Sequence, residues 1–144
     1  MKKIIAASLL ASVFASVAAQ AATGPEEVKL ADDTFAAIGD AAKDINLARQ
    51  FEIVAIEDRA GVVKNSFEAT LSANVIAGMI DQPANNRIGV VAGSNKGRVV
   101  FTGSSVGGSV SQCGDQIKKD VEDLAASAVK DGALNLAEPN GCGL

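Results

Sequence analysis

Alternation of apolar and polar residues over residues 67–79 limits the fold of this chain more than any other feature. Every second residue there is apolar: Phe67, Ala69, Leu71, Ala73, Val75, Ala77 and Met79. A period of two is typical of a strand with one buried face, so we expect a long half-buried strand. A helix over residues 66–80 is the alternative, because Asn65 with Glu68 can cap a helix and alanine is frequent in this segment.

Neighbouring segments also predict strands. Residues 51–56 alternate between two faces and are followed by a turn sequence. Apolar runs at residues 88–92 and 99–102 flank Gly93–Gly97, which reads Gly-Ser-Asn-Lys-Gly and predicts a hairpin. Residues 103–114 are rich in glycine and serine, and we expect a loop or an irregular sheet edge there.

Two further segments have the three-to-four-residue spacing of amphipathic helices. The first begins with the capping box Thr23-x-x-Glu26 and extends to about Leu47. Its apolar face comprises Val28, Ala31, Phe35, Ile38, Ala42 and Ile45. The second begins near Asp115 and ends near Lys130. Its apolar face comprises Ile117, Val121, Leu124, Ala125, Ala128 and Val129.

The order of these segments predicts an α+β fold. It would contain an amphipathic N-terminal helix, an antiparallel sheet of about four or five strands, and a C-terminal helix tied to the tail by a disulfide. No internal repeat and no second core are apparent in the sequence.

Residues 1–21 have the pattern of a secretory signal peptide. Lys2 and Lys3 precede an almost wholly apolar run, and Ala19-Gln20-Ala21 is a small-x-small cleavage site. The run is rich in alanine and serine and no basic cluster follows it, so we expect cleavage near Ala21 rather than a retained membrane anchor. The mature chain, residues 22–144, would then be a single domain without a membrane span, located in the bacterial periplasm or secreted.

Cys113 and Cys142 are the only cysteines. In the oxidising compartment that a signal peptide implies, an even pair is usually joined, so we predict a disulfide that closes a loop of about 30 residues. A redox-active pair is the alternative. Redox couples normally have the close Cys-x-x-Cys spacing, which is absent here, and the prediction is therefore a structural bridge.

Charge and aromatic content argue against several classes of partner. Without Lys2 and Lys3 the chain has 11 basic and 17 acidic residues, a formal charge of 11 − 17 = −6. An acidic protein repels phosphate groups, so neither nucleic acid nor an anionic lipid surface is expected as a partner. The sequence has five Phe, no Trp and no Tyr, which also disfavours recognition of bases or sugars by stacking.

The sequence contains no histidine. This removes Ser-His-Asp and Cys-His catalysis and histidine-rich zinc sites, and with both cysteines oxidised a catalytic thiolate is removed too. An enzyme would have to use carboxylates, Lys and Ser. We therefore expect no catalytic residues, no cofactor and no metal site, and an enzymatic function is disfavoured.

Acidic residues are the first candidates for a site. The adjacent pairs are Asp32-Asp33, Glu57-Asp58 and Glu122-Asp123. Neighbouring side chains point in different directions on a helix or strand, so none of these pairs can flank one bond as two catalytic acids do. Asp40 and Asp44 would share a helix face, either as a weak divalent-cation site or as part of a solvated acidic surface. The acidic surface is the preferred interpretation, because no calcium-loop pattern is present.

Two short motifs are further candidates. Ser127-Ala128-Val129-Lys130 matches the Ser-x-x-Lys of penicillin-binding enzymes, but it lacks their partner motifs and lies at the end of a predicted helix. Residues 103–109, Gly-Ser-Ser-Val-Gly-Gly-Ser, suggest a phosphate-binding loop, but no Gly-Lys-Ser/Thr follows. We interpret the first as part of a helix and the second as a mobile loop.

Two partial family resemblances lack defining residues. The order helix, antiparallel strands and disulfide-closed C-terminus is similar to the globular part of type IV pilins, but their processing site is absent from residues 1–30. The segment from Cys113 through Asp131-Gly132-Ala133 to Cys142 is similar to a module of small envelope-stress lipoproteins, which carry a lipobox cysteine that this chain lacks. No family is assigned.

Two β-prone stretches, residues 69–80 and 99–114, carry no charge. Such stretches either pair with another chain or are central strands covered by helices. We expect an exported, non-enzymatic envelope or extracellular protein that acts through protein contacts, with itself or with another protein. The alternatives are a subunit of an extracellular filament or surface assembly, and a small apolar-ligand carrier or an enzyme of unknown type.

Overall fold

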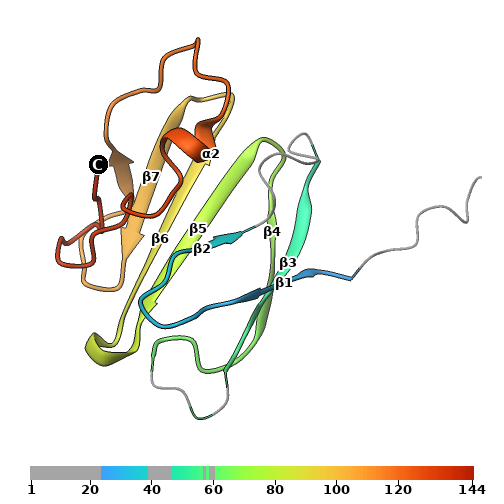
Figure 1. Cartoon of the computed structure of the whole chain (residues 1–144), viewed down its shortest axis with the longest axis vertical. Coiled ribbons are helices and arrows are strands. Elements are labelled where there is room, and N and C mark those ends of the chain that lie inside the picture. Colours follow the sequence, from blue (N-terminus) through green and yellow to red (C-terminus); the bar gives the residue numbers. More distant parts are fainter. Residues whose placement is uncertain (1–23, 39–46, 57, 59–60) are drawn as a thin grey trace, which may run out of the picture.

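The computed structural model describes residues 24–38, 47–56, 58 and 61–144, and it shows a protein built mostly of strands (Figure 1). The expected signal peptide, Glu57, Asp40 and Asp44 lie outside the described residues. Eight strands form two sheets, and the helical residues are confined to the four-residue α2 (Leu124–Ser127) and the 3-10 turn η1 (Pro83–Asn85), within the described ranges. The predicted α+β fold with two long helices is therefore wrong.

The smaller sheet has three strands in the order β1-β3-β4. They are β1 (Glu26–Lys29), β3 (Arg49–Val54) and β4 (Phe67–Leu71). β1 runs parallel to β3, whereas β4 runs antiparallel to it.

The larger sheet has five strands, all antiparallel, in the order β2-β5-β6-β7-β8. They are β2 (Ala36–Ile38), β5 (Val75–Gln82), β6 (Arg87–Ser94), β7 (Val99–Ser104) and β8 (Ser111–Cys113). In Figure 1 the smaller sheet lies on the β5 side of this sheet, away from β7.

Strands β1 and β2 replace the described part of the predicted N-terminal helix. Val28 and Leu30 are buried while Glu27 and Lys29 are exposed, which is the period of two of a strand. Asp33 then adopts a left-handed conformation with φ of 54°, and the chain turns before β2. The helical spacing was misleading because it combined apolar residues from two strands separated by this turn.

Arg98 explains why the second predicted helix is reduced to α2. Its guanidinium donates hydrogen bonds to the backbone carbonyl groups of Ile117, Lys118 and Val121. In a helix these carbonyl oxygens would accept N–H groups four residues further on, so the two arrangements compete. Helix formation begins only at Asp123, whose carboxylate caps α2 by accepting the N–H of Ala126 at 3.0 Å.

The alternating segment 67–79 forms strands, so the helical alternative is wrong. It is not one strand, however, because a turn at residues 72–74 divides it into β4 and β5. Asn74 has a φ of 63°, and the N–H of Val75 donates to the carbonyl of Ser72 at 3.2 Å. The same alternating pattern therefore supplies one strand to each sheet.

The predicted hairpin is confirmed as β6 and β7, which pair from Gly89–Ser104 to Ser94–Val99. A loop or an irregular sheet edge was expected over residues 103–114. Residues 105–110 form the connection between β7 and β8, whereas Gly103 and Ser104 belong to β7 and Ser111–Cys113 form β8, the edge strand of the larger sheet. None of the helices in the described part of the chain is long and apolar enough to cross a membrane.

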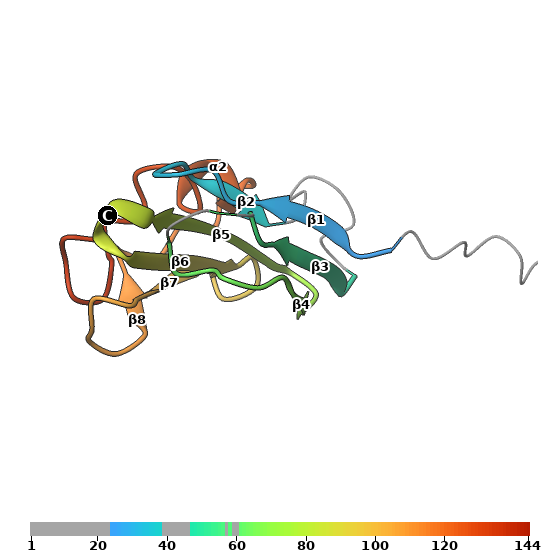
Figure 2. The ribbon, with the colours of Figure 1, turned by 90° about the horizontal axis from the view of Figure 1, so that it is seen from below.

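Two hydrophobic clusters lie on opposite faces of the larger sheet and share β5. Ile76 and Ile80 of β5 pack in the first cluster, together with Leu124 of α2 and with Leu134 and Leu136 of the C-terminal segment. Figure 2 shows β5, β6 and β7 side by side, with β1 and β3 beyond β5. Ala77 and Met79 pack in the second cluster, against residues of β1 and β3 such as Ile53. β5 is therefore buried on both faces.

Glycines allow the C-terminal segment to approach the larger sheet closely. A Cβ atom at Gly89 would lie 2.3 Å from Cδ2 of Leu136, and one at Gly93 would lie 2.9 Å from Cγ2 of Val129. Real Cβ atoms do not come this close, so at either position a larger residue would make the neighbouring side chain shift, and glycine permits the close approach of this segment.

The predicted disulfide is present. Cys113 of β8 and Cys142 are bonded, with their Cα atoms 5.4 Å apart and a separation of 29 positions in sequence. Cys142 also forms an isolated antiparallel bridge with Leu134. The bond therefore ties the edge strand of the larger sheet to the C-terminal segment that covers it, although not to the predicted helix.

Candidate functional site

An apolar surface over β6 and β7 is the main candidate site. Antiparallel pairing places Val90 opposite Gly103 and Ala92 opposite Phe101, so these four residues share one face of the sheet. The second hydrophobic cluster covers this face over β5 but ends before β7. As a result Phe101 keeps 45% of its surface exposed and Val90 37%, although both belong to regular strands.

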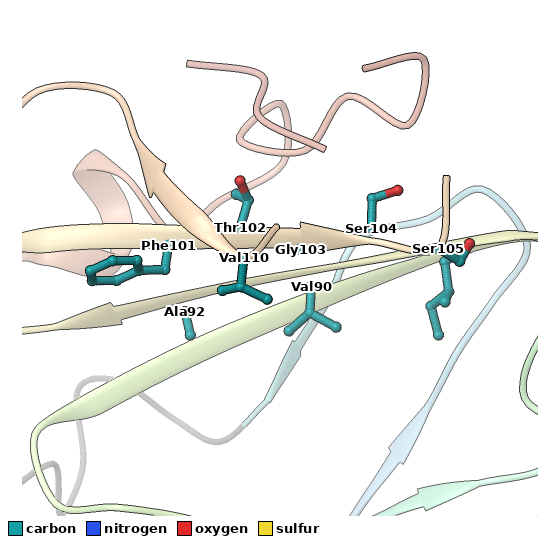
Figure 3. Close-up of a pocket in the computed structure, with 9 residues that line it drawn as sticks. Val90, Ala92, Phe101, Thr102, Gly103, Ser104, Ser105 and Val110 are labelled. Carbon is teal, nitrogen blue, oxygen red and sulfur yellow. The ribbon is translucent and has the colours of Figure 1, made fainter. Parts of the chain in front are cut away.

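The surface is hollowed into an open groove of about 400 Å³. Nine residues line it: Ile88, Val90, Ala92, Phe101, Thr102, Gly103, Ser104, Ser105 and Val110. Figure 3 shows Val90 and Ala92 pointing to one side of the hairpin and Thr102 and Ser104 to the other. We refer to this hollow and its lining as the hairpin groove.

Val110 forms one side of the hairpin groove. It lies in the connection between β7 and β8, and its side chain packs over Gly103, where an added Cβ would be 3.0 Å from Cγ2 of Val110. Val110 nevertheless remains 73% exposed, the highest value for a large apolar residue among those described. The glycine thus lets this apolar side chain lie low over the strand and narrow the groove.

Two serines at the end of β7 contribute to the groove lining, although the Ser104 side chain points away from Val90 and Ala92 (Figure 3). The hydroxyl oxygen of Ser105 accepts the backbone N–H of Ile88 at 2.9 Å, and that of Ser104 accepts the N–H of Val106 at 3.1 Å. Both hydroxyl groups therefore fix the turn that follows β7. Among the described residues that line the groove, none is charged.

The two uncharged stretches of the sequence have different environments. Residues 75–80 are in β5, which is covered on both faces, although mostly by strands and the C-terminal segment and not by the expected helices. Residues 69–71 of the same stretch are only partly covered, in β4 at the edge of the smaller sheet. Residues 99–104 are in β7, which is covered on one face only. The uncharged stretch at residues 99–114 therefore reaches the protein surface.

The acidic candidates of the described chain have structural roles or are exposed. Asp32 forms an isolated bridge with Asp81, and the N–H of Asp33 donates to the carbonyl of Asp81 at 3.0 Å. Asp58 has a left-handed φ of 57°, and Asp123 caps α2. In the part of the chain that the structure describes, no three His, Cys, Asp or Glu side chains are grouped as metal ligands.

The two short motifs do not form a site in the structure. The Ser127 hydroxyl donates to the carbonyl of Leu124 at 3.2 Å at the end of α2, and Lys130 is exposed in the segment that follows. The glycine- and serine-rich residues 103–109 divide between the end of β7 and a turn with positive φ at Gly107 and Gly108. Of these residues, Gly103, Ser104 and Ser105 line the hairpin groove.

Asp81 is a buried acidic residue that the sequence reasoning missed. It is fully buried in β5, and its carboxylate accepts the backbone N–H groups of Val62 at 3.2 Å and Val63 at 3.4 Å. Gly61 permits this contact, because a Cβ there would lie 2.8 Å from Oδ2 of Asp81. Continuing the alternation Ala77, Met79 by one step would have placed Asp81 on the buried face.

A second hollow of about 580 Å³ lies beside the loop that Arg98 holds. It is lined by Gly114, Asp115, Gln116, Ile117, Lys118, Val121, Ser127, Ala128 and Leu144. Asp115 and Lys118 give it charges of both signs, and its lining comes mostly from loop residues. The hairpin groove is the better candidate because regular strands position it.

Comparison of the chain with protein-family models, with curated proteins and with solved structures found no match.

Proposed function

We propose that this chain is an exported, non-enzymatic protein of the bacterial envelope or exterior that acts through protein contacts at the hairpin groove. The observation that carries the proposal is the exposure of Phe101 and Val110 on the uncovered face of a regular hairpin. Exposed apolar side chains gathered around a hollow are typical of interaction sites, whereas single exposed apolar residues are ordinary.

The composition of the groove favours a protein surface over a small ligand. Small-molecule sites usually enclose most of the ligand and orient it with a few convergent polar or charged groups. The hairpin groove is open, none of the described residues that line it is charged, and the hydroxyl oxygen of Ser105 already accepts a backbone N–H group. An aromatic side chain at the centre of an apolar surface is instead common where two proteins meet.

Two features support the exported location. Residues 1–21 have the pattern of a signal peptide, and the Cys113–Cys142 disulfide is of the kind that persists in oxidising compartments. N-terminal sequencing of the protein recovered from the periplasm or the medium should start near Ala22. Recovery of the chain from the cytoplasm with Met1 intact would contradict export.

Photo-crosslinking in the producing cells tests the contact surface. A photoreactive amino acid at Phe101 or Val110 should give covalent adducts with protein, because both side chains are exposed at the groove. The matched control is the same amino acid at Lys130, which is exposed on the α2 side of the molecule. Absence of protein adducts at positions 101 and 110, or equal adducts at position 130, would overturn the proposal.

A further inference from the structure

We infer that the partner at the hairpin groove is a second copy of this chain, packed groove to groove about a two-fold axis. This inference rests on the proposal that the groove is a protein-contact surface, and it specifies the partner. Three properties of the groove support this inference. The described lining of the groove carries no charge although the chain is acidic, it has both protruding apolar side chains and a hollow that can receive them, and its apolar surface is small.

The charge distribution is compatible with self-pairing. In a two-fold interface each residue near the axis meets its own copy, so a charged residue there faces a like charge. The mature chain would carry a formal charge of −6, yet residues 99–114 carry none, and Arg98 and Asp115 mark the two ends of this stretch. Two acidic copies can therefore approach each other through this surface without placing like charges in contact.

The shape of the surface is also suited to self-pairing. A two-fold interface uses the same surface on both subunits, so that surface must carry both the projections and the recess that receives them. Phe101 and Val110 project from β7 and from the connection to β8, and the hollow lies between them and Val90. Each copy can thus offer exposed apolar side chains to the hollow of the other.

The size of the surface predicts a weak and reversible dimer. Stable complexes bury about 800 Å² on each partner. The exposed large apolar side chains of the groove are Val90, Phe101 and Val110, which form a smaller surface than such an interface requires. We therefore expect a dissociation constant on the order of micromolar or weaker.

Sedimentation velocity of the exported protein, from about 1 µM to 1 mM, tests the inference. The expected result is a reversible monomer–dimer equilibrium. Phe101→Asp would place like charges at the paired surfaces and should weaken dimerisation by more than about tenfold. Val110→Asp should act in the same direction, and because Val110 is 73% exposed outside the strands this variant has little reason to fail to fold.

Phe67→Asp is the matched control. Phe67 is also a strand phenylalanine and is 44% exposed, against 45% for Phe101, but it lies in β4 of the smaller sheet and does not line the groove. It should leave the dimerisation constant within about twofold of the unmodified protein, which is the scatter expected of a distant surface change. Equal weakening by Phe67→Asp and Phe101→Asp would place the interface elsewhere and overturn the inference.

A protein that stays monomeric at about 1 mM, or one that forms a continuing series of larger species, would also overturn the closed dimer. These outcomes are distinct from failure of the proposed function. If the purified chain is monomeric while positions 101 and 110 crosslink to a different protein in cells, the contact surface stands and only the identity of the partner is wrong. If neither position crosslinks to protein, the proposed function itself fails.

Discussion

The aromatic ring of Phe35 lies directly against Gly78 of β5, where a Cβ atom would come within 2.0 Å of Cζ of Phe35. Phe35 precedes β2 and packs against the first hydrophobic cluster. The contact therefore fixes the N-terminal chain to the centre of the larger sheet, and it leaves no room for a side chain at position 78.

Gly78→Ala should destabilise the protein by about 1–3 kcal/mol, because an added methyl group in a packed interior forces its neighbours to move. Urea unfolding monitored by circular dichroism measures the change. Gly97→Ala is the control, since a Cβ at Gly97 would meet nothing closer than 3.6 Å. Similar losses for the two variants would show that the Phe35 contact does not limit position 78.

Removal of the disulfide by the double substitution Cys113→Ala and Cys142→Ala should cost roughly 3–4 kcal/mol in the free energy of unfolding, as the chain-entropy model gives for a loop of this length. The bond joins two residues 29 positions apart, and the loop that it closes includes α2 and the segment that covers the first cluster. Thiol titration of the denatured, unreduced protein should find no free thiol. Two free thiols would show that the bond is absent from the purified protein.

Arg98→Gly tests the contact that holds residues 117–121 out of a helix. Arg98 has a φ of 55°, which glycine tolerates. Any loss of stability in this variant therefore comes from the missing guanidinium group and not from backbone strain. We expect a destabilisation of about 1–3 kcal/mol from the lost hydrogen bonds to carbonyl groups. Amide hydrogen exchange should accelerate in residues 117–121 and remain unchanged in β5, and unchanged exchange in both segments would contradict this role.

Thr102→Val should stabilise the protein. Thr102 is 1% exposed on the core face of β7, and its Oγ1 has no hydrogen-bond partner among the described residues. Replacing an unpaired buried hydroxyl with a methyl group of the same shape removes its desolvation penalty, so a gain of about 1 kcal/mol is expected. A lower urea midpoint for the variant would indicate that the hydroxyl has a partner after all.

Asp81→Ala should destabilise the protein by about 1–3 kcal/mol, because it leaves the partly buried N–H groups of Val62 and Val63 without their acceptor. Asp81→Asn keeps one acceptor oxygen and should lose less. Thermal unfolding of the two variants distinguishes these contributions. Equal losses would show that the charge of the carboxylate, rather than the number of acceptors, determines the effect.

Local patterns predicted the parts of the fold that depend on local interactions. The Gly93–Gly97 turn between two apolar runs correctly predicted β6 and β7, because turn chemistry and pairing are both encoded within one short segment. The cysteine pair correctly predicted the disulfide. The alternation from Phe67 correctly predicted strands, although it did not reveal the turn at Asn74, which transfers the chain from one sheet to the other.

The helical predictions failed because tertiary contacts outweighed local spacing. Residues 115–121 have a helical pattern, but the guanidinium of Arg98, about twenty positions away, binds the carbonyl groups that a helix would use. Residues 26–38 have apolar positions at helical intervals, but the burial of Val28 and Leu30 alternates as in a strand, and β1 pairs with β3, which follows about twenty residues later in the sequence. Neither the Arg98 hydrogen bonds nor the pairing of β1 with β3 can be recognised from the residues of one short sequence segment.

The hairpin groove could not be predicted for a related reason. Apolar residues such as Val90 and Phe101 have the same pattern in a covered strand as in an exposed one. Their exposure depends on where the packing of β1 and β3 ends over the larger sheet. The uncharged stretch at residues 99–114 was the available signal, and it marked the surface without showing its shape.

The burial of β5 on both faces has a consequence for how the protein unfolds. Successive residues of β5 belong alternately to the two hydrophobic clusters. If either cluster is pulled away from β5, one face of this strand becomes exposed, and the remaining cluster also depends on β5. Partial melting of one layer would therefore remove support from its neighbour. This coupling favours concerted loss of the two clusters, and the protein has little opportunity to populate a half-folded species with an exposed β5 edge.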